Sequence, residues 1–182
     1  GTNLDPARMS ERCPHSPMQT TGWLEGWRLT FGGEEHGWDG SMSTIVQDPY
    51  SQVFVAVYDI TREDESDLDD WESVGTGLYR KTKVRVATMT GEIVVWTYVL
   101  DAYEGGLPSA SYLEVLASAA EAADAPADSV AALRRRPPRP DLRAPDGSPA
   151  HRGSLTFLAV DTPPNCRTPL AHCGPPHAAS AR

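Results

Sequence analysis

Hydrophobic residues alternate with polar residues, or run together, in five short segments, and this pattern predicts a strand-rich body. The segments are residues 23–31, 44–47, 53–60, 79–89 and 92–100. Gly26 interrupts the first segment, which favours a bulge at that point. Residues 48–51 predict a turn between the second and third segments, and Thr90-Gly91 predicts a hairpin between the last two. The third segment is apolar on both faces, so we expect a central strand there.

Four further segments have helical patterns: residues 6–13, 61–73, 109–123 and 127–135. Asp5 before Pro6 is a strong helix start, because Asp can cap a helix and Pro is tolerated at its first position. Thr61 followed by Asp64 resembles a capping box, with Asp in place of the usual Glu. Strands with helices at loops and ends indicate an α+β fold, with a closed or nearly closed sheet.

The composition fits one globular domain with an appendage. The chain has 182 residues, 40% of them hydrophobic, and a net charge of −9 at pH 7. Residues 131–182 carry eight arginines against three aspartates, so the negative charge is concentrated in residues 1–130. An acidic body would repel a phosphate backbone, so we expect a small molecule and not nucleic acid as the partner. The sequence leaves the oligomeric state open, a homodimer included.

The sequence also bears on the expected compartment. No run approaches the roughly 18 apolar residues of a membrane span and no signal-peptide pattern occurs, so we expect no membrane partner. Cys13, Cys166 and Cys173 are too few and too scattered for a disulfide framework, which favours a reducing cytoplasm. His172 and His177 lie near the last two cysteines, but the tight Cys pairs of structural zinc sites are missing, so no metal is expected.

The pattern changes near residue 137. Ten of the 16 prolines lie after residue 136, and only Leu155–Val160 has a strand pattern. We therefore predict a folded domain over residues 1–136 and a disordered tail over residues 137–182. From about residue 129 the mixture of Arg, Pro, Ala and His is typical of GC-rich coding sequence read in the wrong frame. This is a hypothesis that the DNA sequence would test.

Glu72 is the strongest candidate for catalytic chemistry because of its place in the acidic segment 61–73. On a helix, Leu68, Trp71 and Glu72 fall on one face, so Glu72 would lean against apolar side chains while the other acids face water. Loss of solvation would raise its pKa towards the range useful for proton transfer. The alternative is a solvated helix that carries Glu72 at its frayed end.

The chain begins with Gly1-Thr2-Asn3-Leu4, a turn before a helix whose backbone N–H groups can bind an anion or a polarised carbonyl oxygen. Together with Leu68–Tyr79, this turn resembles the γ-glutamylcyclotransferase (AIG2-like) family. The hallmarks of that family are a Gly-Ser/Thr-Asn-Leu loop and a Leu-Asp-x-x-Glu-x-Val-x-x-Gly-x-Tyr stretch. Thr97–Leu100 and Pro108–Tyr112 look like its later strand and its Pro-Ser-x-x-Tyr helix start. The resemblance covers about residues 1–136.

The resemblance implies a small mixed β-barrel with flanking helices and a cofactor-free enzyme of the intramolecular aminoacyl-transfer (C–N lyase) class. The α-amine of a γ-glutamyl substrate attacks its own δ-carbonyl and releases 5-oxoproline and an amine or amino acid. Glu72 is then the general acid/base, since one proton must leave the attacking amine and another must reach the departing one. The substrate-binding residues that the resemblance implies are Gly1, Thr2, Asn3, Leu4, Tyr79, Tyr98 and Tyr112.

Two other functions remain open at this point. The aromatic residue and the strand that precede Gly1 in the family are not in this chain, so we expect an N-terminally truncated sequence. A non-catalytic, small-molecule-binding protein of the same fold is therefore one alternative. A cyclotransferase that removes a γ-glutamyl protecting group in a biosynthetic pathway is the other, because only the leaving amine differs.

Overall fold

The computed structural model describes residues 1–33, 40–101, 104–140 and 158–160. The strands are β1 (Met18–Gly32), β2 (Met42–Tyr58), β3 (Tyr79–Thr88), β4 (Gly91–Leu100) and the short β5 (Leu158–Val160). The helices are α1 (Pro6–Arg12), α2 (Arg62–Trp71), α3 (Ala110–Ala122) and α4 (Ala127–Arg134), with the 3₁₀ turns η1 (Thr2–Leu4) and η3 (Val74–Thr76). Predictions for residues 34–39, 141–157 and 161–182, including most of the predicted tail and its Cys and His residues, lie outside the described residues.

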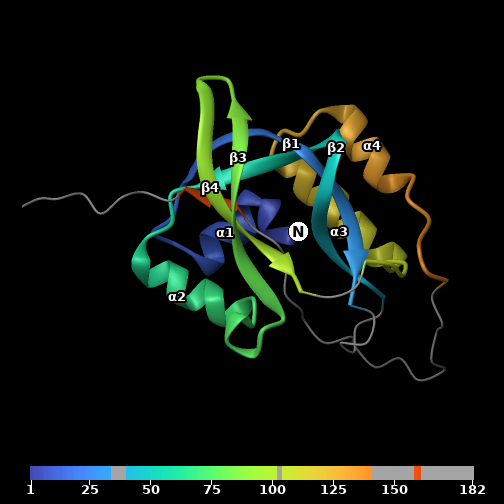
Figure 1. The fold of residues 1–182 in the computed structure, drawn as a ribbon, viewed down its shortest axis with the longest axis horizontal. Coiled ribbons are helices and arrows are strands. Elements are labelled where there is room, and N and C mark those ends of the chain that lie inside the picture. Colours follow the sequence, from blue (N-terminus) through green and yellow to red (C-terminus); the bar gives the residue numbers. More distant parts are fainter. Residues whose placement is uncertain (34–39, 102–103, 141–157, 161–182) are drawn as a thin grey trace, which may run out of the picture.

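Four long antiparallel strands with helices around them confirm the predicted α+β class (Figure 1). β1 pairs with β2, and β3 pairs with β4. β1 and β3 meet at only two residue pairs, Gly22 with Thr88 and Trp23 with Ala87. A Cβ atom at Gly22 would lie 2.5 Å from the carbonyl oxygen of Ala87. The two hairpins therefore approach each other at a point where only glycine fits.

The expected closed barrel is met only in part. The strand order is β1–β2–β5–β4–β3, so the described part of the chain has β5 between β2 and β4 and no direct ladder joining those two long strands. β5 runs parallel to β2 and antiparallel to β4, and it is only three residues long. The four long strands by themselves form an open sheet, because closure depends on this short segment.

The prediction of two strands around a turn at residues 48–51 is wrong in one respect, because β2 is a single strand. Trp27 pairs with Gln47 while Glu25 pairs with Gln52, so residues 48–51 bulge opposite Gly26. The Asp48 side chain closes this bulge by accepting hydrogen bonds from the Tyr50 amide and the Ser51 hydroxyl. Gly26 has a φ of 76°, which confirms the predicted interruption of β1.

The helix starts follow the sequence signals. The Asp5 carboxylate accepts from the Ala7 amide at 2.9 Å with Pro6 at the first position of α1, and the Thr61 hydroxyl accepts from the Asp64 amide at 3.2 Å. In a capping box the Thr61 amide would donate directly to the Asp64 side chain, but here Ser16 stands between them. Ser16 accepts from the Thr61 amide and donates to the Asp64 carboxylate, so Asp64 fastens α2 to the segment between α1 and β1.

Two clusters form the centre of the fold. One lies between the sheet and the helices α1 and α2, and its fully buried members include Met9, Leu68, Tyr58, Tyr79 and Tyr98. The other consists of aliphatic side chains of the four long strands. α3 packs its apolar stripe, which includes Leu113 and Leu116, against Phe31 of β1. Within the described residues, no helix is long and apolar enough to cross a membrane.

Candidate active site

Glu72 caps the C-terminus of α2 and is completely buried. Its amide donates to the Leu68 carbonyl at 2.9 Å, which places the two side chains on the same inward face. Trp71 differs from the prediction, because its side chain is 48% exposed and lies outside that buried face. The residue after Glu72, Ser73, has a φ of 52°, so the chain turns sharply away from the helix at this point. The end of α2 thus places the Glu72 carboxylate in the interior of the protein.

The N-terminal turn meets that carboxylate. Thr2 and Asn3 are buried, and the Nδ2 amide of Asn3 donates to Oε1 of Glu72 at 3.0 Å. The structure therefore brings together the two segments that carry the sequence resemblance, 69 positions apart. Within the turn, the Leu4 amide already donates to the Gly1 carbonyl at 3.1 Å. Its N–H group stabilises the turn, so it is a poorer candidate oxyanion donor than the resemblance implied.

Two arginines of α1 belong to this site, and the sequence analysis missed both. Arg12 donates from Nη1 to Oδ1 of Asn3 at 2.6 Å, and Arg8 donates from Nη1 to the Thr2 hydroxyl at 2.8 Å. The Arg12 guanidinium also lies over the Trp71 ring, 4.8 Å from its centroid. The available signal was their spacing, because positions four apart share a helix face directly after the turn.

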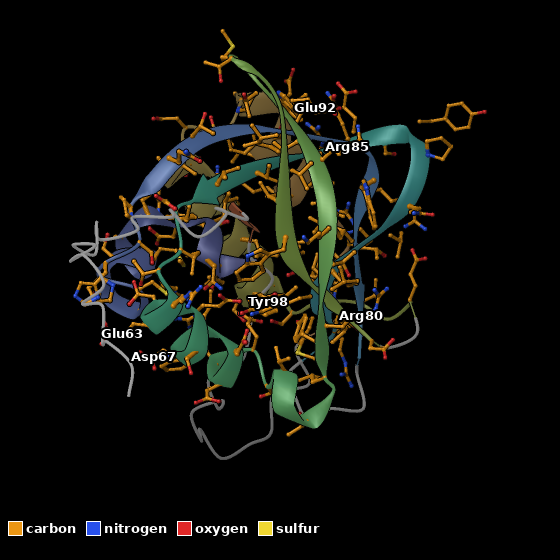
Figure 2. The ribbon with its side chains drawn as sticks, turned by 60° about the vertical axis from the view of Figure 1, so that its left-hand side comes forward. Glu63, Asp67, Arg80, Arg85, Glu92 and Tyr98 are labelled. Atoms are coloured by element: carbon orange, nitrogen blue, oxygen red, sulfur yellow. The ribbon has the colours of Figure 1, made fainter. Side chains whose placement is uncertain are left out.

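The three predicted tyrosines come from three elements around Glu72. Tyr98 points from β4 towards α2, where its hydroxyl donates to the Asp69 carboxylate (Figure 2). The Tyr112 hydroxyl lies 2.8 Å from the Ser43 hydroxyl, and the Tyr79 hydroxyl donates to the Met42 sulfur at 3.9 Å.

The negative charge of Glu72 acts on two of these tyrosines, Tyr98 and Tyr112. Burial, followed by the Asp69 contact, raises the pKa of Tyr98 far above its ordinary value. Burial also raises the pKa of Tyr112 to about 12. The negative charge of Glu72 adds to both shifts, so both phenols lie within its field. They stay protonated at neutral pH and can donate hydrogen bonds there.

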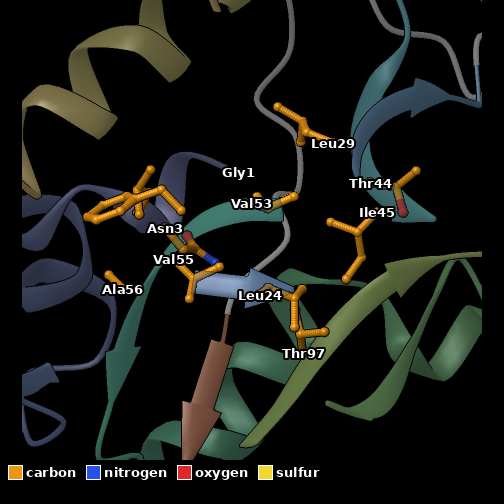
Figure 3. A pocket seen from close by; sticks show the side chains of 12 residues that line it. Gly1, Asn3, Leu24, Leu29, Thr44, Ile45, Val53, Val55, Ala56 and Thr97 are labelled. Carbon is orange, nitrogen blue, oxygen red and sulfur yellow. The ribbon is translucent and has the colours of Figure 1, made fainter. Parts of the chain in front are cut away.

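An apolar pocket opens beside Asn3 (Figure 3). Its cavity volume is about 60 Å³, and most of its wall is aliphatic side chains of β1 and β2, such as Leu24, Ile45 and Val55. Its polar lining comes from Asn3, Thr44 and Thr97. Glu72 and the three tyrosines do not line this pocket, so Asn3 is the residue shared by the cavity and the carboxylate. The described part of the chain holds no group of three His, Cys, Asp or Glu side chains placed to bind a metal ion.

The structure thus places a buried carboxylate at the end of a helix against the Gly-Thr-Asn-Leu turn, on an α+β scaffold. The family model described as "AIG2-like family" matches residues 52–133. Human and mouse gamma-glutamylcyclotransferases are each 30% identical to the chain over 126 residues, which are 66% of this chain and 67% of each relative. A solved structure titled "Gamma-glutamyl cyclotransferase" superposes with a TM-score of 0.71 at 26% identity, covering 81% of this chain and 90% of that one. The chain therefore belongs to the AIG2-like, γ-glutamylcyclotransferase family.

Proposed function

We propose that this chain is a γ-glutamyl cyclotransferase that converts a γ-glutamyl amine or amino acid into 5-oxoproline and the free amine, with Glu72 as general acid/base. The hydrogen bond from Asn3 to the buried Glu72 carboxylate carries the proposal. It supports a site in which one carboxylate, shielded from water, faces the turn that would bind the reacting carbonyl.

The reaction moves two protons from the attacking nitrogen to the leaving nitrogen. Glu72 removes the first proton from the α-ammonium group, and the freed amine attacks the δ-carbonyl of the same molecule. Glu72 gives this proton to the leaving nitrogen as the bond to that nitrogen breaks, and the ionised Glu72 then takes the second proton from the new ring nitrogen and passes it to the departing amine. Because the attack is intramolecular, a pocket that holds the folded-back conformer supplies much of the rate enhancement.

The remaining residues stabilise charge and position the substrate. We assign the developing oxyanion to the backbone amides of Thr2 and Asn3, where each donor in comparable sites contributes about 3–4 kcal/mol. Leu4 and Gly1 shape this turn through their own hydrogen bond. Tyr79, Tyr98 and Tyr112 would orient the α-carboxylate or Glu72, the first through packing and the other two as protonated phenols.

Two broader statements belong to the same proposal. The chemistry needs no metal or cofactor, and the substrate is a small γ-glutamyl compound met in the cytoplasm. Removal of a γ-glutamyl protecting group is the same chemistry with another leaving amine.

A substrate panel tests the assignment. The full chain is incubated with γ-glutamyl dipeptides and γ-glutamyl amines, and 5-oxoproline is measured by mass spectrometry. We expect product from at least one member. Calorimetry on the same panel addresses the non-catalytic alternative, since saturable binding without 5-oxoproline from any member would establish a binding protein instead.

A further inference from the structure

Asn3 has a different partner on each end of its amide group. Arg12 donates to the carbonyl oxygen Oδ1, and the amide nitrogen Nδ2 donates to Glu72. Asn3 is 1% exposed and Glu72 is completely buried, so water cannot readily replace either bond. The three side chains come from α1, η1 and the end of α2 and form one continuous hydrogen-bonded line.

The two ends of an asparagine amide differ in hydrogen-bonding capacity, and Arg12 determines which end meets Glu72. A guanidinium can only donate, so it selects the Oδ1 end and turns the NH₂ end towards the carboxylate. An ionised carboxylate accepts from that NH₂ group, whereas a flipped amide would present its oxygen and favour protonated Glu72. The orientation of Asn3 therefore favours one protonation state of the base.

We propose that Arg12 is a positioning residue for Glu72, holding the Asn3 amide so that the buried carboxylate stays ionised and ready to accept the proton of the substrate ammonium group. This role rests on the proposed function, because it concerns the same carboxylate. Arg12 acts through Asn3 and through its own positive charge, and it does not touch the reacting atoms.

Several charged or titratable groups face Glu72 from the elements around it. Its charge interacts with Arg12 of α1, the amino group of Gly1, Tyr98 of β4 and Tyr112 of α3. The two phenols are neutral at working pH, and burial lowers the pKa of the Gly1 amine to about 6, so Arg12 is the cationic member of this set near pH 7. Burial, followed by the neighbouring Arg8, lowers the pKa of Arg12, yet a guanidinium remains protonated in proteins. A comparison of variants that share Gly1 therefore isolates Arg12.

The test compares Arg12→Met and Arg12→Lys with wild type and with Arg85→Met. Arg85 is exposed on the β3–β4 hairpin, where it pairs with Glu92 (Figure 2). The measurement is kcat/KM for 5-oxoproline formation across pH. For Arg12→Met we expect the acidic limb to move upwards by about one pH unit, equivalent to a tenfold loss at pH values below the limb. Arg12→Lys should give an intermediate shift, because lysine keeps the positive charge but lacks the planar guanidinium group that holds the Asn3 amide.

A purely structural Arg12 would give a different result. Loss of its stacking on Trp71 would lower the Tm and reduce kcat/KM by the same factor at every pH, so the acidic limb would stay at the same pH. That outcome in both Arg12 variants, or an equal shift in Arg85→Met, would overturn the proposal. If Arg12→Met does not fold, Arg12→Lys decides the question alone.

A second readout separates this inference from the proposed function. Carbon NMR of the side-chain carboxyls, with the Glu72 signal assigned from Glu72→Gln, follows the titration of that group without any substrate. An upward-moved midpoint in the Arg12 variants supports the positioning role even if no γ-glutamyl compound is turned over. An unmoved midpoint alongside normal 5-oxoproline production refutes the role and leaves the cyclotransferase assignment intact.

Discussion

At the scale of single residues, Asn3 links Glu72, Arg12 and the apolar pocket. Its amide bonds both Glu72 and Arg12, and its side chain also lines the apolar pocket. A buried polar group that loses its partner costs more than the bond itself contributed, because water cannot replace the partner. Asn3 thus links the stability of the fold to the proposed catalytic role of Glu72.

We expect Asn3→Leu, which keeps the branched shape of the side chain and removes both hydrogen bonds, to lower the free energy of unfolding by about 1–3 kcal/mol. The same change should reduce kcat/KM at least tenfold, since Glu72 loses its donor. Chemical denaturation and 5-oxoproline assays measure the two effects.

The matched control for this change is Ser10→Ala on α1, whose exposed hydroxyl bonds only its own helix at the Pro6 carbonyl. It should leave both quantities unchanged. Equal stability and activity in Asn3→Leu and wild type would remove Asn3 from the account.

At the scale of elements, α2 is fixed at both ends. Glu72, the residue that caps its C-terminus, reaches Asn3. Near the start of the helix, the buried Asp64 accepts hydrogen bonds from the Ser16 hydroxyl at 2.6 Å and the His15 amide at 3.0 Å. Burial alone would raise the pKa of Asp64, but the hydrogen bonds from Ser16 and His15 outweigh it and hold the pKa below its ordinary value. The position of Glu72 therefore depends on a contact at the other end of its helix.

Asp64 should make stability depend on pH in the acidic range. A carboxyl whose folded-state pKa is depressed contributes stability that is present above its unfolded pKa, near 3.9, and is lost as pH falls through the folded pKa. Asp64→Asn should therefore lower the free energy of unfolding by about 1–3 kcal/mol at pH 7 and by less below pH 3. Urea denaturation at several pH values measures the difference.

Asp67→Asn is the control for this prediction, because Asp67 is an exposed acid on the same helix (Figure 2). It should have little effect at any pH. A destabilisation by Asp64→Asn that is constant from pH 2 to pH 7 would contradict the assigned role of the charge.

The contact between β1 and β3 gives a prediction about the sheet. Gly22→Ala would place a Cβ atom 2.5 Å from the Ala87 carbonyl oxygen and 2.7 Å from a Val86 methyl group. The two hairpins must then separate, so we expect a loss of about 2 kcal/mol or more in the free energy of unfolding.

Gly75→Ala serves as the comparison for stability, because a Cβ atom there meets nothing within 4 Å. If Gly22→Ala and Gly75→Ala have the same Tm, the close approach of the hairpins is not a constraint.

At the scale of the whole molecule, the site is assembled from parts that are far apart in the sequence. The periodic pattern predicted the long strands, the helices and the inward register of Glu72, because these depend on neighbours within one element. It did not predict that Arg12 would meet Asn3, since the spacing of Arg8 and Arg12 marks a shared helix face but does not indicate what that face contacts. It also divided β2 into two strands, because the residue types that favour a turn at residues 48–51 occur both in loops and in β-bulges.

The central claim is that Glu72 performs the proton transfers, and one comparison tests it most directly. Wild type, Glu72→Gln and the control Glu63→Gln, an exposed acid of the same helix, are assayed for 5-oxoproline release from the best γ-glutamyl substrate. Because general acid–base catalysis contributes about 10²–10⁴-fold, kcat should fall at least a hundredfold in Glu72→Gln and remain unchanged in Glu63→Gln. Equal rates for folded Glu72→Gln and wild type would contradict the account.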